Sequence, residues 1–252
     1  MAIRNILPSF IYTRLFGDRK QFGLDIQEQD SDWQAWLNFY NIFYTDTQST
    51  GVGERVNHLG YKVLNNIDFK GKIVAEIGPG SLPHLAYWNA MPDSYYAIDV
   101  KKDFLENAQR LLPDICKQVL VKRDQKIPLA EHSLDILLTF YSLEHIRNLD
   151  DQLTHYFQLL KKDGILVGAI PNEGGIAWGL GRYLTTRRFV KNNADFNYDK
   201  IICWEHPNFA DDILRSIKKC GFKLQLLQYK PLSFIPLTDT NLVTLFIATK
   251  QE

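Results

Sequence analysis

The fold is decided by the stretch Val74-Ala75-Glu76-Ile77-Gly78-Pro79-Gly80-Ser81-Leu82-Pro83-His84. Its apolar start predicts a buried strand that is covered on both faces. Gly78 and Gly80 predict a sharp turn, because a residue without a Cβ lets the backbone bend and approach a ligand closely. Ser81 predicts the cap of a following helix, with Pro83 in its first turn. A glycine turn between a strand and a helix N-terminus favours a nucleotide-like ligand.

Two cofactor classes use such a turn, and two residues bear on the choice between them. The dinucleotide fingerprint requires a third glycine at the position where this chain has Pro83. Glu76 places a carboxylate at the strand end, which repels a diphosphate and suits a cationic ligand that carries an amino acid. An ordinary strand–turn–helix of an α/β protein remains the alternative at this point.

Length and composition predict a globular protein without attraction to nucleic acid. The 252 residues suit one large domain or one domain with an appendage. Basic and acidic residues number 29 each, so the net charge does not favour a polyanion. Three widely spaced cysteines, with no zinc-site spacing and no bilayer-length apolar run, predict a cytoplasmic protein with reduced thiols and no bound metal.

Strand and helix patterns alternate after about Lys72. This alternation predicts a parallel sheet with right-handed crossovers, and two late strands predict an antiparallel hairpin at one edge. The expected fold class is therefore α/β, with a doubly wound, mostly parallel seven-stranded sheet, an antiparallel C-terminal hairpin and an N-terminal helical cap. Strands are expected at 74–77, 95–100, 118–121, 133–141, 165–170, 222–227 and 242–249, and helices at 104–112, 150–162 and 208–219.

Residues 1–70 have no strand pattern and predict a helical cap over the opening of a domain at 71–252. Residues 1–21 combine an apolar stripe with basic flanks, which predicts a helix that packs on its own domain or rests peripherally on a membrane surface. The other elements expected in this region are an aromatic-faced helix from 31, a loop at 45–53 and a helix at 54–65.

Asp99 ends the second expected strand, roughly twenty residues after the glycine turn. A carboxylate at that spacing accepts both hydroxyls of a ribose. An aspartate at the surface end of a strand is the alternative. Because the turn with Glu76 precedes it, ribose binding is the favoured interpretation.

Several segments together resemble the class I S-adenosylmethionine-dependent methyltransferases. The resemblance covers about Lys72 to Lys250 and implies S-adenosylmethionine as the cofactor. One departure is Leu82, which stands where many members have a further glycine and reduces the space around the methionine end. The segments that carry the resemblance are Glu76-Ile77-Gly78-Pro79-Gly80, Asp99, Arg123-Asp124-Gln125-Lys126-Ile127-Pro128-Leu129 and Phe140-Tyr141-Ser142-Leu143-Glu144-His145-Ile146.

The resemblance also implies where each part of the cofactor is bound. Glu76, Gly78 and Gly80 are expected at the methionine end, and Asp99 on the ribose. Asp124 is expected to contact the adenine amino group. The remaining cofactor-binding candidates are Gln125, beside Asp124, and Tyr141, at the end of the fourth strand.

His145 follows the fourth strand, beside the expected cofactor. A histidine there can act as a general base, because its ordinary pKa lies near neutrality. It can equally shape the acceptor pocket or bond to the backbone, and both interpretations stay open. His206 is the second candidate base.

A long insertion at 171–207 follows the fifth strand and is expected to build the acceptor site, because loops that leave the strand ends face the ligand. Arg182, Arg187 and Arg188 lie within it and suit a phosphorylated or sugar-bearing acceptor. A solvated basic face explains the same residues. The insertion also has a looser similarity to a methyltransferase subgroup from bacterial surface-polysaccharide gene clusters, which implies a saccharide.

The sequence thus predicts methyl transfer to an oxygen or nitrogen nucleophile of a small-molecule acceptor, which includes a saccharide or a phosphorylated or lipid-linked sugar. Such a reaction depends mainly on aligning the nucleophile with the methyl group and excluding water. A nicotinamide-dependent oxidoreductase or epimerase is one alternative, although no Tyr-x-x-x-Lys pair is placed to serve it. A non-catalytic S-adenosylmethionine-binding interaction domain is the other.

Overall fold

The computed structural model describes residues 2–43 and 51–251. The loop expected at 45–53 therefore lies partly outside the described residues. Its end differs from the prediction, because helix α4 (Gly51–Tyr61) already begins at Gly51. Within the described part of the chain, no helix is both long and apolar enough to cross a membrane.

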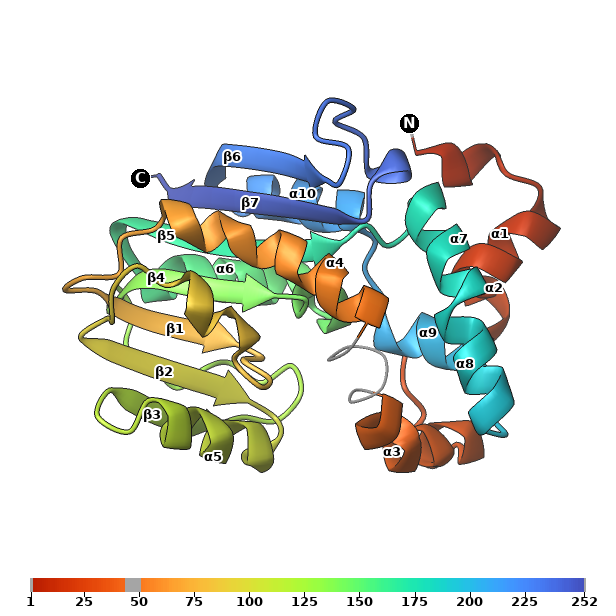
Figure 1. The fold of residues 1–252 in the computed structure, drawn as a ribbon, viewed down its shortest axis with the longest axis horizontal. Helices are drawn as coiled ribbons and strands as arrows, with labels where there is room; N and C mark the ends of the chain where they lie inside the picture. Colours follow the sequence, from red (N-terminus) through yellow and green to blue (C-terminus); the bar gives the residue numbers. More distant parts are fainter. Residues whose placement is uncertain (1, 44–50, 252) are drawn as a thin grey trace.

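A seven-stranded sheet in the order β3-β2-β1-β4-β5-β7-β6 forms the centre of the molecule (Figure 1). Strands β1 to β5 pair in parallel, and β7 runs antiparallel to both β5 and β6. The prediction of a doubly wound sheet with an antiparallel C-terminal hairpin is confirmed. The strands are β1 (Ile73–Ile77), β2 (Ser94–Asp99), β3 (Cys116–Leu120), β4 (Leu134–Phe140), β5 (Leu160–Pro171), β6 (Phe222–Lys230) and β7 (Val243–Lys250).

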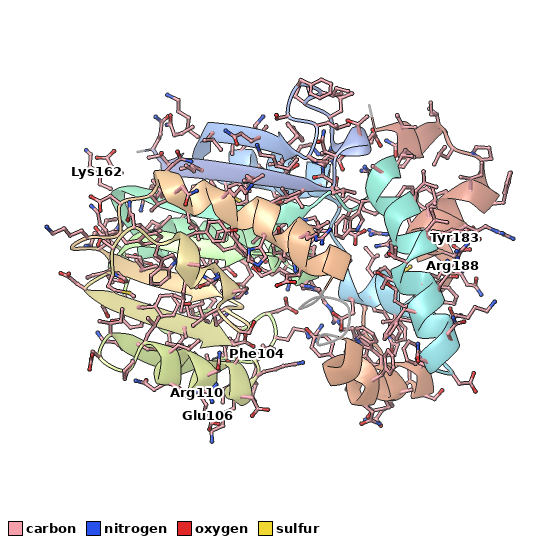
Figure 2. The ribbon with its side chains drawn as sticks, viewed as in Figure 1. Phe104, Glu106, Arg110, Lys162, Tyr183 and Arg188 are labelled. Carbon is pink, nitrogen blue, oxygen red and sulfur yellow. The ribbon has the colours of Figure 1, made fainter. Side chains whose placement is uncertain are left out.

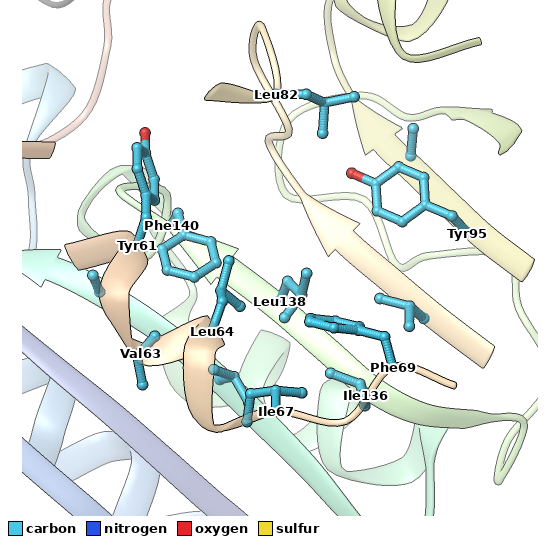
Figure 3. Packing of buried hydrophobic residues seen from close by; sticks show 14 of the residues in the cluster. Tyr61, Val63, Leu64, Ile67, Phe69, Leu82, Tyr95, Ile136, Leu138 and Phe140 are labelled. Carbon is cyan, nitrogen blue, oxygen red and sulfur yellow. The ribbon is translucent and has the colours of Figure 1, made fainter. Parts of the chain in front are cut away.

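Helices cover both faces of the sheet, as Figure 1 shows. One face packs against α4, the 3-10 helix η3 (Lys62–Asn66) and α5 (Lys102–Leu111). The other face packs against α6 (Leu149–Leu159) and α10 (Ala210–Lys219). In Figure 3 the apolar side chains of Tyr61, Leu64 and Phe69 lie against those of Leu138 and Phe140 on β4. Strand β4 is therefore buried on both faces, as its apolar run predicts.

The remaining helices form a lobe beside the carboxyl ends of the parallel strands (Figure 1). Its core joins Trp33 and Trp36 from the N-terminal region to Ile201 and Trp204 from the insertion. Two segments far apart in the sequence thus pack on each other to make the lobe, whereas α4 packs on the sheet. The lobe consists of η1 (Ile3–Ile6), α1 (Ser9–Phe16), α2 (Arg19–Phe22), α3 (Ser31–Phe43), α7 (Ile176–Leu184), α8 (Thr186–Asn193) and α9 (Tyr198–Glu205).

The single helix expected at 1–21 is broken into η1, α1 and α2. Gly17 ends α1 with φ +79°, and a Cβ there would lie 2.5 Å from the Sγ of a buried cysteine. Two of the basic residues also turn inward. Arg4 pairs with Asp211 at 2.7 Å, and Arg19 donates to two main-chain carbonyls at the end of the insertion. These two residues therefore do not flank an external apolar stripe.

The full helix expected after the glycine turn does not form. A short 3-10 helix, η4 (Pro83–Tyr87), follows the turn instead. Its N-cap is Leu82, which has left-handed φ of 58°, and no side chain caps η4. The side chain of Leu82 is buried in the core beneath the turn. Leu82 therefore takes the N-cap position of η4, and the hydroxyl of Ser81 does not cap the helix.

Candidate active site

One cavity of about 730 Å³ runs along the carboxyl ends of the parallel strands and into the lobe. Its lining falls into two parts, which we call the cofactor end and the acceptor end. The cofactor end comprises Glu76, Gly78, Gly80, Asp99, Asp124, Gln125 and Tyr141, and the acceptor end comprises Glu144, His145, Glu173, Trp178, Arg182, Tyr198, Glu205 and His206.

The glycine turn has the backbone conformation that its composition predicts. Gly78 has φ of +67° and Gly80 has φ of +56°, in the region that residues with a Cβ rarely adopt. The amide of Gly78 donates to the carbonyl of Ile98 at 2.9 Å, which ties the turn to β2. A Cβ on Gly78 would make only ordinary contact, at 3.4 Å from Ser142 Cβ. The positive φ, rather than crowding, is therefore what requires glycine here.

Glu76 is buried at the end of β1, and only one of its carboxylate oxygens has a partner in the part of the chain that the structure describes. Its Oε2 accepts a hydrogen bond from the Tyr95 hydroxyl at 2.5 Å and lies 3.0 Å from Nε2 of His84. Burial and the charge of Glu76 hold the pKa of Tyr95 well above its usual value, so the phenol stays a donor. Its Oε1 is buried and makes no hydrogen bond within the described residues. An unsatisfied carboxylate oxygen in the cavity wall fits the ammonium group of a bound methionine.

Asp99 ends β2 and lines the cavity beside the turn. Its Oδ1 accepts the amide hydrogen of Lys101 at 2.8 Å. Burial raises the pKa of Asp99 to about 6, against the lowering effect of the amides of Lys101 and Val100. The carboxylate is therefore short of hydrogen-bond donors, which the two hydroxyls of a ribose would supply.

Asp124 and Gln125 also line the cavity, on the loop between β3 and β4. Asp124 has φ of +57° and accepts the amide hydrogen of Arg147 at 3.2 Å, while its carbonyl accepts from Gln152 at 2.8 Å. Gln125 accepts the amide hydrogen of Lys122 at 2.9 Å. Helix α6 thus fixes the loop through Gln152, and both side chains stay at the edge where adenine is expected.

Tyr141 follows β4 and joins it to helix α4. It has φ of +53°, and its hydroxyl donates to the carbonyl of Asn57 at 2.8 Å. Burial, with the nearby Tyr61 and Glu144, raises the pKa of Tyr141 well above its usual value. Tyr141 lines the cavity, but its hydroxyl is already hydrogen-bonded to the main chain of α4.

The two candidate bases, His145 and His206, lie side by side with ring centroids 4.7 Å apart. Nδ1 of His145 donates to the main-chain carbonyl of Glu205 at 2.7 Å and lies 3.3 Å from its carboxylate. Burial alone would lower the pKa of His145, but Glu205 and Glu144 outweigh it and raise the pKa to about 9. His145 is therefore an imidazolium at neutral pH, which argues against the general-base role considered from the sequence.

Glu173 holds the other histidine together with Arg182. His206 Nδ1 donates to Glu173 Oε1 at 2.5 Å, and Arg182 Nη1 donates to the same carboxylate at 2.6 Å. Burial would raise the pKa of Glu173, but Arg182 and His206 lower it. Arg182 thus lines the acceptor end as predicted, but its charge is already compensated.

Arg187 and Arg188 do not line the cavity, which corrects their expected place at the acceptor. Arg187 forms a two-pronged ion pair with Asp199 on α9 and donates to the carbonyl of Arg14. Arg188 is exposed at the outer side of the lobe (Figure 2). The acidic partner of Arg187 lies twelve positions later, so it was not evident from the sequence cluster.

Glu144 is the residue that sequence reasoning missed. It is 2% exposed, lines the cavity, and its Oε2 makes no hydrogen bond within the described residues. Its Oε1 lies 3.8 Å from Nε2 of His145, and burial raises its pKa. The available signal was its position directly before His145, at the carboxyl end of a buried strand.

Helix α3 closes the cavity from the lobe side. Trp36 Nε1 donates to Glu205 at 2.9 Å, and the ammonium of Lys101 lies 3.3 Å from the ring centroid of Tyr40. The first contact holds α3 to the insertion, and the second holds it to the loop after β2. The N-terminal region therefore takes part in shaping both ends of the cavity.

Comparison with known proteins identifies the domain around this cavity. Residues 75–168 match the family model described as a methyltransferase domain. The chain is also 24% identical over 152 residues to the mitochondrial arginine-hydroxylase NDUFAF5 of Danio rerio. That match covers 59% of this chain and 44% of the relative, so the chain spans less than half of the relative's length.

Solved structures share the fold at low sequence identity. An S-adenosylmethionine-dependent methyltransferase from Mesorhizobium loti superposes with a TM-score of 0.52 at 14% identity, covering 73% of this chain and 93% of that one. The methyltransferase CalH, in complex with SAH, superposes with a TM-score of 0.53 at 15% identity, covering 76% of this chain and 54% of that one.

The matched family model, the sheet order and the cavity define a class I S-adenosylmethionine-dependent methyltransferase domain. The part of the chain that the family model matches is therefore a methyltransferase domain, for which S-adenosylmethionine is the cofactor. The left-handed glycine turn and the free oxygen of Glu76 fit the methionine half of that cofactor.

Proposed function

We propose that this protein transfers the methyl group of S-adenosylmethionine to an oxygen or nitrogen of a small-molecule acceptor at the acceptor end. One observation carries the proposal: a single cavity connects Gly78 and Asp99 with Glu173 and His206. A nucleophile bound at the acceptor end would lie in the same cavity as the cofactor's sulfonium. Alignment and exclusion of water are the main requirements of methyl transfer.

Glu144 is the proposed proton acceptor. The cofactor supplies an electrophilic methyl group on a positively charged sulfur. With the cofactor bound, the Glu144 carboxylate would take up the proton that the acceptor's hydroxyl or amine loses on methylation. Its raised pKa and its unpaired Oε2 support this role, because a carboxylate of higher pKa is a better base. The neighbouring imidazolium of His145 would stabilise the carboxylate before transfer.

The chemistry of the acceptor end favours a neutral, hydroxyl-rich acceptor such as a saccharide. Trp178 and Tyr198 line the cavity with aromatic rings, and Oε2 of Glu144, which has no partner among the described residues, is a hydrogen-bond acceptor for a hydroxyl group. A phosphate is disfavoured there, because Glu173 already neutralises Arg182. The support for a saccharide thus rests on these side chains and not on Arg187 or Arg188.

The test is transfer of a labelled methyl group from S-adenosylmethionine to a panel of acceptors. Neutral sugars and glycosides are expected to yield labelled product, and phosphorylated analogues that place phosphate at the reacting end are not. Asp99→Asn serves as the control that weakens the cofactor site. If S-adenosylmethionine binds but no acceptor is labelled, the non-catalytic binding domain becomes the better account. If only phosphorylated acceptors are labelled, the saccharide assignment is wrong.

A further inference from the structure

Large apolar side chains are exposed on three segments, two from the lobe and one from the connection between β6 and β7. Phe234 is 79% exposed, Ile6 is 72% exposed and Phe10 is 67% exposed. Such side chains normally lie in a core, and a cluster of them marks an interaction surface. We call this surface the apolar corner. It comprises Ile3, Ile6 and Phe10 of η1 and α1, Leu180 and Leu184 of α7, and Phe234 and Leu237 of the β6–β7 connection.

Hydrogen bonds hold the three segments of the apolar corner together. Asp239 Oδ2 accepts the amide hydrogen of Ile3 at 3.2 Å, and its Oδ1 accepts that of Ile176 at 3.3 Å. Helices α1 and α7 also cross closely, since a Cβ on Gly179 would lie 2.8 Å from the ring of Phe16. Figure 1 shows the N-terminus, α7 and the β6–β7 connection meeting at one side of the molecule.

The stretches that carry these apolar side chains contain basic residues but no acidic ones. The chain as a whole has 29 basic and 29 acidic residues, yet 1–17, 174–194 and 224–238 contain no aspartate or glutamate. Exposed basic side chains follow the apolar residues: Arg14 comes one helical turn after Phe10, and Arg188 and Lys191 lie on α8. Figure 2 places Arg188 at the outer side of the lobe. Apolar side chains with exposed basic neighbours complement an anionic lipid surface, and the nearby carboxylate of Asp239 is engaged by the amides of Ile3 and Ile176.

We propose that the apolar corner docks this protein onto a membrane surface that contains anionic lipids. The apolar side chains enter the headgroup region, and Arg14, Arg188 and Lys191 contact lipid phosphates. Helix α7 connects this surface to the cavity, because Leu180 and Leu184 are exposed while Trp178 and Arg182 on the same helix line the acceptor end. An acceptor held in the membrane would therefore have a short route to the cavity. This consequence rests on the proposed methyl transfer, whereas the docking itself does not.

The test measures binding of the full chain to vesicles and uses no enzymatic readout. The wild type should co-sediment with vesicles of equal parts phosphatidylglycerol and phosphatidylcholine, and less with phosphatidylcholine alone. Ile6→Ser with Phe10→Ser should weaken binding by roughly tenfold or more, because two large apolar contacts are lost. Arg188→Glu with Lys191→Glu should weaken binding to the anionic vesicles selectively, and added salt should reduce the difference.

Met91→Ser with Leu120→Ser is the matched control, because both side chains are similarly exposed, at 60% and 59%, but belong to the β1–β2 connection and to β3. Circular dichroism and the melting temperature establish that each variant is folded. The proposal is overturned if the folded wild type does not bind anionic vesicles, or if the control loses as much binding as the Ile6/Phe10 variant. It is also overturned if the wild type forms a dimer that the Ile6/Phe10 variant abolishes, since the occupant is then a second copy of the chain.

Discussion

The rings of His145 and His206 lie edge to face with centroids 4.7 Å apart, and each is held by a different glutamate. His145 follows β4 and pairs with Glu205, whereas His206 follows α9 and pairs with Glu173. The two pairs join the end of the central strand to the insertion. They therefore fix where the acceptor end lies relative to the cofactor end, and Glu144 lies beside them with one oxygen that has no partner in the described part of the chain.

Glu144→Gln should lower kcat by about 10²-fold or more, because the amide cannot accept the acceptor's proton. Binding of S-adenosylmethionine should stay within about twofold of wild type, since the cofactor end is unchanged. Steady-state methyl transfer and calorimetry measure the two effects. Glu106→Gln, an exposed glutamate on α5, is the matched control (Figure 2). If Glu144→Gln turns over normally while His206→Gln is inactive, the proton acceptor is His206 and the assignment is wrong.

Binding of S-adenosylmethionine should strengthen between about pH 5 and about pH 7. The pKa of Asp99 is raised from 3.8 to about 6, so the side chain is largely protonated below that pH. Protonated Asp99 stabilises the folded state at low pH, and this stabilisation is lost as the pH rises through about 6. The carboxylate that forms above that pH is the better acceptor for the ribose hydroxyls, so cofactor binding strengthens.

Asp99→Asn tests this pH dependence. It should weaken binding by roughly tenfold and remove the pH dependence near 6, because hydrogen bonds to a charged group are the stronger ones. Asp103→Asn, at an exposed position of α5, should leave both unchanged. An undiminished pH dependence in Asp99→Asn would assign the titration to another group.

Arg182→Met should destabilise the protein by about 3–5 kcal/mol, because it removes the main cation beside a buried carboxylate, Glu173. The double variant Glu173→Gln with Arg182→Met should recover part of the loss, since no charge is then buried alone. Urea unfolding measures both. Arg188→Met, an exposed arginine of the next helix, should change the free energy of unfolding by less than about 0.5 kcal/mol. If Arg182→Met also lowered the free energy of unfolding by less than about 0.5 kcal/mol, the ion pair between Arg182 and Glu173 would not stabilise the fold.

Gly60→Ala should destabilise the fold by about 1–3 kcal/mol through overpacking. A Cβ there would lie 2.2 Å from the Tyr141 hydroxyl and 2.6 Å from Ala169 Cβ, so α4 would have to move off the sheet. Gly181→Ala is the matched helical control, because among the described residues no atom beyond its chain neighbours and its own helix backbone lies within 4 Å of its Cβ position, and alanine should stabilise α7 by about 0.5–1 kcal/mol. Equal melting temperatures for the two variants would contradict the close packing of α4.

The sheet was predictable because its determinants are local. The apolar run of β4 and the strand–helix alternation after Lys72 define buried parallel strands whatever their partners are. The helix expected after Gly80 failed because Leu82 packs into the core with φ of 58°, and tertiary packing prevailed over the local signals of Ser81 and Pro83.

The acceptor end was less predictable because pairing across the fold decides it. Arg187 and Arg182 have equivalent side chains, yet Asp199 holds the first at the surface and Glu173 holds the second in the cavity wall. The contact of Trp36 with Glu205 likewise joins residues from opposite parts of the chain. No spacing in the sequence carries such information.

Calorimetric titration of the wild-type protein with S-adenosylmethionine, S-adenosylhomocysteine and NAD tests the central assignment most directly. The free oxygen of Glu76, the left-handed turn at Gly78 and the cavity carboxylate of Asp99 predict binding of both sulfur ligands. They also predict little affinity for NAD, because Glu76 faces the place where a diphosphate would lie. Binding of both sulfur ligands, weakened by Asp99→Asn, is the expected result. Binding of NAD with no heat from either sulfur ligand would contradict the assignment of the cofactor end.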